Sequence, residues 1–173
     1  LRQQGHRVLL FSQFTMLLDL IEDYVRLRGH SYERLDGNVT GQSRQNAIDR
    51  YCAPESDTFL FLLGTRAGGV GINLVAADTV VIYDPDWNPQ IDLQAMGRAH
   101  RIGQTKPVRV YRLITEGTVE ERVFVRAQKK LFLSETVNRG GGGAEGDEEE
   151  LEKLSGAEVL SMIKFGAASV FSG

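Results

Sequence analysis

The sequence predicts a three-layer α/β domain with a mostly parallel sheet, followed by a C-terminal helical tail segment. Five short apolar runs have the length of buried strands, and stretches of helical periodicity lie between them. Strands that alternate with helices form parallel pairs, because parallel neighbours need crossover connections. The expected strands cover residues 7–11, 31–35, 59–63, 79–83 and 108–114.

Four helical stretches are expected, and their ends have recognisable signals. Gly29 follows the first as a C-terminal cap. Pro89 follows a capping Asn88 at the start of the third. Thr118 and Glu121 have capping-box spacing at the start of the fourth. The expected helices cover 15–28, about 41–52, a stretch from Pro89 and a stretch from Thr118.

The charge is divided unevenly along the 173 residues. The net charge is −3, but seven acidic residues and two lysines lie from Gly140 onward, so the body before it is mildly basic. We expect a body over 1–134, a flexible Gly-rich acidic linker over 135–153, and a helical brace or regulatory segment over 154–173. The chain begins at Leu1 without a signal or membrane segment, so we expect an excised soluble fragment. A single cysteine, Cys52, fits a reducing compartment.

A glycine-rich loop, GTRAGGVGINL at 64–74, follows the third expected strand. Gly69 and Gly71 let the backbone approach a phosphate, and Thr65 and Arg66 add a hydroxyl and a cation. The alternative is an ordinary turn between a strand and a helix. A dinucleotide fingerprint fits less well, because Leu74 occupies the third glycine position.

Two further features follow the fourth strand. Trp87 lies on a loop bounded by prolines, where it would contact a nucleic-acid backbone, transmit movement or pack beneath the next helix. On a continuous helix, Gln94, Arg98 and Arg101 would lie within about 60° of one another. Guanidinium groups on one face suit a polyphosphate, and the alternative is a solvated basic face with ordinary ion pairs. His100 lies off that face, where we expect packing or capping.

Five motifs in order resemble the C-terminal RecA-like lobe of superfamily-two helicases, specifically Swi/Snf-type remodelling ATPases. The segment ending in KFGAASVF is similar to the one that follows the motor in the ISWI and CHD groups. The motifs are RVLLFSQF at 7–14, YERLDG at 32–37, GTRAGGVGINL at 64–74, DTVVIYDPDWNPQ at 78–90 and QAMGRAHRIGQ at 94–104.

The resemblance implies roles for particular residues. Arg98 and Arg101 match paired catalytic arginine fingers, and Trp87 matches a tryptophan that couples hydrolysis to DNA movement. Gly69, Gly71 and Gln94 are the expected ATP-binding residues. Expected DNA-backbone contacts are Ser12, Gln13, Thr40, Arg44, Thr65 and Arg66.

The sequence contains no GxxxxGK[ST] phosphate loop, so half of an ATP site is missing. The resemblance implies a nuclear, DNA-dependent ATPase that uses ATP with Mg²⁺, held mainly by a first RecA-like lobe. Its other partners would be double-stranded DNA, nucleosomes with their histones, and accessory subunits, with no membrane. We expect this lobe alone to hydrolyse ATP negligibly. Two alternatives stay open: a strand-separating helicase, and a non-enzymatic remnant that binds DNA or protein.

Overall fold

The computed structural model describes residues 1–66, 71–140 and 160–161, and it places side chains up to residue 132 in the long C-terminal helix. The chain divides into two compact units. The first comprises Leu1–Asp84 and Gln90–Leu113, and the second comprises Pro85–Pro89 and Ile114–Gly173. The predicted body over 1–134 therefore contains the first unit and the beginning of the second.

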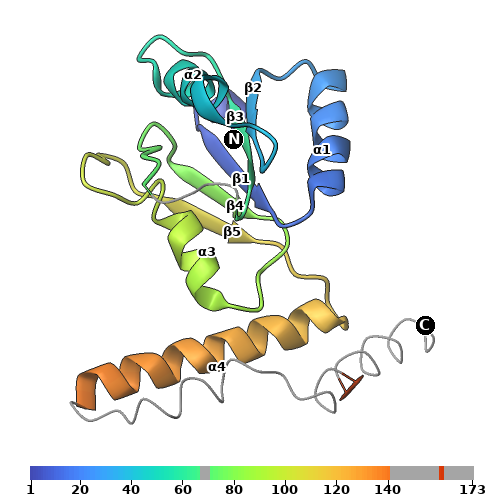
Figure 1. The fold of residues 1–173 in the computed structure, drawn as a ribbon, viewed down its shortest axis with the longest axis vertical. Helices are drawn as coiled ribbons and strands as arrows, with labels where there is room; N and C mark the ends of the chain where they lie inside the picture. The colour runs from blue at the N-terminus through green and yellow to red at the C-terminus, as the bar shows by residue number, and fades with distance from the viewer. Residues whose placement is uncertain (67–70, 141–159, 162–173) are drawn as a thin grey trace. The chain divides into compact units, whose positions relative to one another are not determined.

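The first unit is built on a parallel sheet with strand order β2-β3-β1-β4-β5 (Figure 1). Every pairing in this sheet is parallel, which confirms the predicted fold class. A 3₁₀ helix, Arg2–Gln4, precedes the first strand. The strands are β1 (Val8–Ser12), β2 (Tyr32–Leu35), β3 (Leu60–Gly64), β4 (Thr79–Ile82) and β5 (Arg109–Arg112).

Side chains of the central strands alternate between two apolar cores, as period-2 geometry requires. The first core lies under α2 (Gly41–Cys52) and α3 (Pro89–Met96), and the second lies under α1 (Thr15–Leu27). Figure 1 shows α1 on one side of the sheet and α2 and α3 on the other. The first core includes Leu9, Phe11, Phe61, Val80, Tyr51 and Ala95, and the second includes Val8, Leu62, Leu18 and Val25.

Helix α1 ends as predicted. Gly29 adopts a φ of +63°, and the next amide, on His30, donates a 3.1 Å hydrogen bond to the Val25 carbonyl. This geometry satisfies carbonyl groups that the last helical turn leaves open.

The second unit contains α4 (Val119–Gly140). The two predicted capping residues act at its start, but with other partners than a capping box would use. The Glu120 amide donates to Thr118 Oγ1 at 3.2 Å, and the Gly117 amide donates to Glu121 Oε2 at 3.1 Å. Residues 135–140, expected as linker, are helical. The rest of the linker lies outside the described residues, and of the predicted 154–173 segment only Leu160 and Ser161 are described, as helical and exposed.

Candidate active site

The predicted motifs of the first unit meet at one edge of its sheet. Strands β1, β2, β3 and β4 run parallel, so the loops that follow them leave from the same edge. In open parallel sheets this carboxyl edge is where ligands bind.

Asp84 links the loops after β1 and β4. Its carboxylate accepts hydrogen bonds from Ser12 Oγ at 2.5 Å and from the Gln13 amide at 2.7 Å. Ser12 is 0% exposed and Asp84 is 7% exposed, so the Ser12 hydroxyl faces the interior rather than the DNA side that the resemblance implied. Sequence reasoning missed Asp84, although an aspartate directly after a buried strand was a usable signal.

The loop after β3 starts against the same junction. The Thr65 amide donates to the Ser12 carbonyl at 2.9 Å. Thr65 Oγ1 is buried and has no hydrogen-bond partner among the described residues, whereas the neighbouring Arg66 is exposed. Gly69, expected to approach a phosphate, lies outside the described residues.

The loop after β2 is held by Asp36. This carboxylate accepts from Arg34 Nη2 at 2.7 Å and from the Asn38 amide at 2.9 Å. Burial would raise the pKa of Asp36, but these hydrogen bonds and the positive charge of Arg34 lower it overall. The loop leads to Thr40, exposed at the start of α2, and to the half-buried Arg44 in the first turns of that helix.

Helix α3 is shorter than the continuous helix that was predicted to carry both arginines of the motif. It ends at Met96, so Gln94 is helical while Arg98 and Arg101 lie in the turns beyond it, and the predicted single helical face was wrong. The chain leaves the helix through hydrogen bonds that span three residues, such as Ala99 N to Met96 O at 3.2 Å. His100 is exposed.

The two arginines nevertheless lie in one electrostatic environment. Partial burial lowers the pKa of Arg98, and the positive charges of Arg101 and Arg44 lower it further. A guanidinium stays protonated despite such a shift, because its ordinary pKa lies far above neutral pH. Three cations therefore act on one another at this edge, which favours binding of a polyanion.

Backbone contacts join the arginine segment to the glycine-rich loop. The Leu74 amide donates to the Arg98 carbonyl at 3.0 Å, and Arg101 Nη1 donates to the Gly71 carbonyl at 3.3 Å. Gly71 has a φ of +100°, a region that other residues rarely adopt. Gly71 thus helps to place Arg101, a contact that the expected phosphate role did not include.

Gln104, the last residue of the motif, was also missed. Its Nε2 donates to the Ala77 carbonyl at 2.7 Å and to the Val75 and Ala99 carbonyls at 3.1 Å. A polar residue at the end of a loop motif carries no sequence signal for such contacts.

Trp87 belongs to the second unit. It is 43% exposed, so part of the indole is available to a partner. The flanking Asp86 is buried and accepts a hydrogen bond from the Asn88 amide at 2.9 Å, which fixes the turn that presents the indole.

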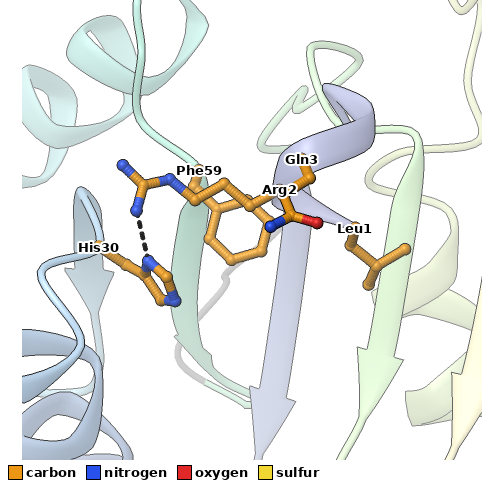
Figure 2. A pocket seen from close by; sticks show the side chains of 5 residues that line it. All are labelled: Leu1, Arg2, Gln3, His30 and Phe59. Atoms are coloured by element: carbon orange, nitrogen blue, oxygen red, sulfur yellow. Dashed lines mark hydrogen bonds between the residues drawn. The ribbon is translucent and has the colours of Figure 1, made fainter.

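A cavity of about 590 Å³ lies at the opposite edge of the sheet, where the strands begin. Figure 2 shows its lining residues, with Arg2 Nη1 donating to His30 Nδ1 at 2.6 Å. Because arginine can only donate, His30 accepts through Nδ1 in this contact. The lining offers neither a nucleophile nor an acid–base pair, so we do not assign the site here. The lining residues are Leu1, Arg2, Gln3, His30 and Phe59.

Within the described residues, no three His, Cys, Asp or Glu side chains group as metal ligands. The same part of the chain contains no helix with the length and apolar character needed to span a bilayer.

Residues 1–103 match the helicase conserved C-terminal domain family. The chain belongs to this family. A helicase C-terminal domain also agrees with the structural comparison: the C-terminal part of the Fun30 ATPase domain matches with a TM-score of 0.67 and 43% identity, over 70% of this chain and 39% of that one.

Three relatives refine the family of this helicase C-terminal domain. It is 55% identical over 172 residues to SWI/SNF-related matrix-associated actin-dependent regulator of chromatin subfamily A member 1 of Mus musculus. It is 52% identical over 171 residues to the chromodomain-helicase-DNA-binding protein 3 homolog of Caenorhabditis elegans, and 51% identical over 172 residues to the ISWI chromatin-remodeling complex ATPase CHR11 of Arabidopsis thaliana. Each match covers 99% of this chain.

These matches confirm the resemblance to Swi/Snf-type remodelling ATPases of the ISWI and CHD groups. The chain spans 16% of the mouse and Arabidopsis proteins and 9% of the Caenorhabditis elegans protein. It therefore corresponds to one part of much longer relatives.

Proposed function

We propose that this domain is the second lobe of an ATP-dependent motor that translocates along double-stranded DNA and slides or otherwise remodels nucleosomes. The carrying observation is the arginine environment at the carboxyl edge of the sheet, where Arg98 is partly buried and acts electrostatically on Arg101 and Arg44. Guanidinium groups in such a place stabilise negative charge that develops on a γ-phosphoryl group during transfer.

In this proposal a first lobe would hold most of ATP and the Mg²⁺ ion, which would offset the negative charge of the phosphates. The present lobe adds cations rather than metal ligands. Its buried carboxylates have internal partners, for example Asp84 with Ser12, Asp36 with Arg34 and Asp78 with His6. Arg98 and Arg101 act as the fingers, and Gln94, exposed on α3, and Gly71 complete the nucleotide-facing edge. Gly69, which lies outside the described residues, keeps its predicted ATP-binding role.

Double-stranded DNA is the proposed track, contacted through its backbone. Thr40 and Arg66 are exposed at loops that leave the same edge, Thr65 directly precedes Arg66, and Gln13 directly follows β1. Contacts of this kind position a protein on DNA without reading its sequence. The buried Ser12 hydroxyl supports the loop instead, and Arg44 belongs with Arg98 electrostatically.

The half-exposed Trp87 is proposed to couple hydrolysis to DNA movement. Nucleosomes and accessory subunits are the proposed partners and the nucleus the proposed location, because the relatives are named as chromatin regulators and remodelling ATPases.

The test is ATP hydrolysis by the full-length protein that contains this lobe, with and without DNA and nucleosomes. Arg98→Ala and Arg101→Ala are each expected to lower stimulated turnover on the order of a thousandfold or more, with DNA binding retained. Arg28→Ala is the matched control, because this exposed arginine at the C-terminal cap of α1 contacts Tyr24 of the same helix. An inert wild type, or finger variants equal to wild type, would favour a binding remnant of a motor.

Two companion measurements separate the remaining alternatives. The isolated 173-residue chain should hydrolyse ATP negligibly, and turnover by the pure chain would contradict the division of the site between lobes. A strand-displacement assay on duplex DNA should detect no separated strands, because the proposed motor moves along the duplex without opening it. Efficient release of single strands would favour a strand-separating helicase.

A further inference from the structure

The side-chain amide of Gln104 connects three backbone segments of the first unit. Its Nε2 donates to the carbonyls of Ala77, Val75 and Ala99 at 2.7, 3.1 and 3.1 Å. Its Oε1 accepts from the Lys106 amide at 2.9 Å. Carbonyls at one end and an N–H at the other define which way the amide points.

These contacts lie inside the arginine segment. Ala99 and His100 lie between the two arginines, and the backbone N–H of Gln104 donates to the Arg101 carbonyl at 3.0 Å. Gln104 therefore holds the backbone of the turn from which both guanidiniums extend. The other side of the connection, at Val75 and Ala77, follows the glycine-rich loop directly.

The surroundings leave little room for a substitute donor. Ala77 and Ala99 are 0% exposed, as is Leu74, whose amide bonds the Arg98 carbonyl. A carbonyl that loses its donor in such a place is not readily rehydrated, so the chain has to shift to satisfy it. A shift of this kind at Ala99 moves the arginines, because Ala99 lies between them in the chain and its carbonyl is what the Gln104 side chain bonds.

We propose that Gln104 is a positioning residue for the arginine fingers. Its side chain links the turn that carries Arg98 and Arg101 to the segment 75–77, so that the two segments move together. The proposal rests on the proposed function above. It assigns no contact between Gln104 and ATP. A displacement near 1 Å of a group that must meet a transferring phosphoryl can lower the rate about a hundredfold.

The side-chain chemistry sets the choice of variants. Glutamine has two N–H donors and an acceptor on one terminal group, and this contact uses both kinds. Gln104→Met keeps the shape and removes all four contacts. Gln104→Glu keeps an acceptor for Lys106 and turns a second oxygen toward the three carbonyls. Thr105→Ala, at the exposed neighbouring position, is the matched control.

The first readout is steady-state DNA-stimulated hydrolysis by the full-length protein. Gln104→Met should lower kcat about 10- to 100-fold, with the KM for ATP within about threefold of wild type, because most of the ATP contacts belong to the other lobe. The Thr105→Ala control should match wild type. A kcat equal to wild type, or loss of folding by both Gln104 variants, would overturn the proposal and leave Gln104 a structural residue only.

The second readout is the pH profile of Gln104→Glu relative to wild type. A carboxylate facing carbonyl oxygens repels them, whereas its protonated form regains one donor, so the relative kcat should rise as pH falls from about 8 to about 6. Arg101, Lys106 and the buried Asp78, which lies 3.8 Å from Lys106 Nζ, are shared by both proteins and cancel in the ratio. A flat ratio would contradict the donor role.

A combined variant separates this inference from the proposed function. If Gln104 acts through the fingers, adding Gln104→Met to a protein that carries both Arg98→Ala and Arg101→Ala should lower the residual kcat by less than about threefold more. Independent, multiplicative losses would overturn the positioning role. An inert wild type would instead defeat the proposed function itself, and an active wild type with a dead Arg101→Ala but normal Gln104 variants would defeat this inference alone.

Discussion

The carboxylate of Asp84 accepts a 2.5 Å hydrogen bond from the hydroxyl of Ser12, across the carboxyl ends of two neighbouring strands. Both residues are buried, and the same carboxylate also holds the amide of Gln13. One side chain thus fixes the first loop of the site against the fourth strand.

Removing that carboxylate should destabilise the first unit. Asp84→Ala leaves the Ser12 hydroxyl and the Gln13 amide without their acceptor, so the free energy of unfolding should fall by about 2 to 4 kcal/mol. Urea unfolding of the chain measures this change in the free energy of unfolding. Asp23→Ala is the matched control, because Asp23 is exposed and its ion pair with the exposed Arg26 is long, at 3.7 Å. Equal stability of the two variants would remove Asp84 from this role.

A methyl group at Gly71 should strain the backbone that holds Arg101. Gly71 has a φ of +100° with open space around it, so the penalty is conformational rather than steric. Gly71→Ala should cost about 1 to 3 kcal/mol of stability and should also reduce stimulated ATP turnover. Gly37→Ala, likewise in open space but without a positive φ, should be close to neutral in both assays. A neutral Gly71→Ala would show that the loop relaxes without moving the arginine.

Arg34 should make the unit sensitive to acid. It bonds Glu22, Asp36 and Asp19, in part-buried pairs that join α1 to β2. Burial raises the pKa of Glu22, but hydrogen bonds from Tyr32 and Arg34 and the charge of Arg26 lower it overall, and the pKa of Asp36 is lowered as well. Groups with depressed folded-state pKa values stabilise above their unfolded values, here 4.5 and 3.8, and lose that contribution as pH falls through the folded values.

Unfolding measured as a function of pH tests this network. Arg34→Met should cost about 1 to 2 kcal/mol near neutral pH and should flatten the decline in stability below about pH 5. Arg50→Met, which removes an exposed arginine from Glu33, should leave the acid slope nearly unchanged. An unaltered slope in Arg34→Met would assign the acid response to other carboxylates.

Trp87 should separate hydrolysis from movement. Because the indole is 43% exposed, Trp87→Ala should leave the lobe folded and reduce stimulated ATP turnover by less than about tenfold. Nucleosome sliding by the full-length protein should fall more steeply than hydrolysis. Trp87→Phe, which retains an aromatic face, should recover part of the sliding. Parallel losses in both assays would mean that Trp87 serves hydrolysis or folding rather than coupling.

Local patterns predicted most of the fold because the elements have clear signals. The alternation in β1, where Leu9 and Phe11 face one core and Val8 the other, and the positive φ of Gly29 both follow from local sequence. The strand order did not, because pairing between distant segments has no local signature.

The conformation of the arginine motif was not predictable from local sequence. In a continuous helix the Arg98 carbonyl would accept from the amide four residues later, but here it accepts from Leu74. That tertiary contact competes with the helix, and no periodicity in the motif reveals it. Ser12 and Asp84 likewise meet across 72 residues of sequence, so the burial of the Ser12 hydroxyl was not predictable from its own motif.

The central position of β1 also has a consequence during synthesis. This strand precedes the other four strands of the sheet along the chain, yet it pairs with β3 at Leu60 and with β4 at Thr79. Until both have emerged, the nascent chain exposes two unpaired edges of an apolar strand. Chaperone protection should therefore matter most before residue 82 has emerged. Chains truncated before that residue should aggregate rather than fold.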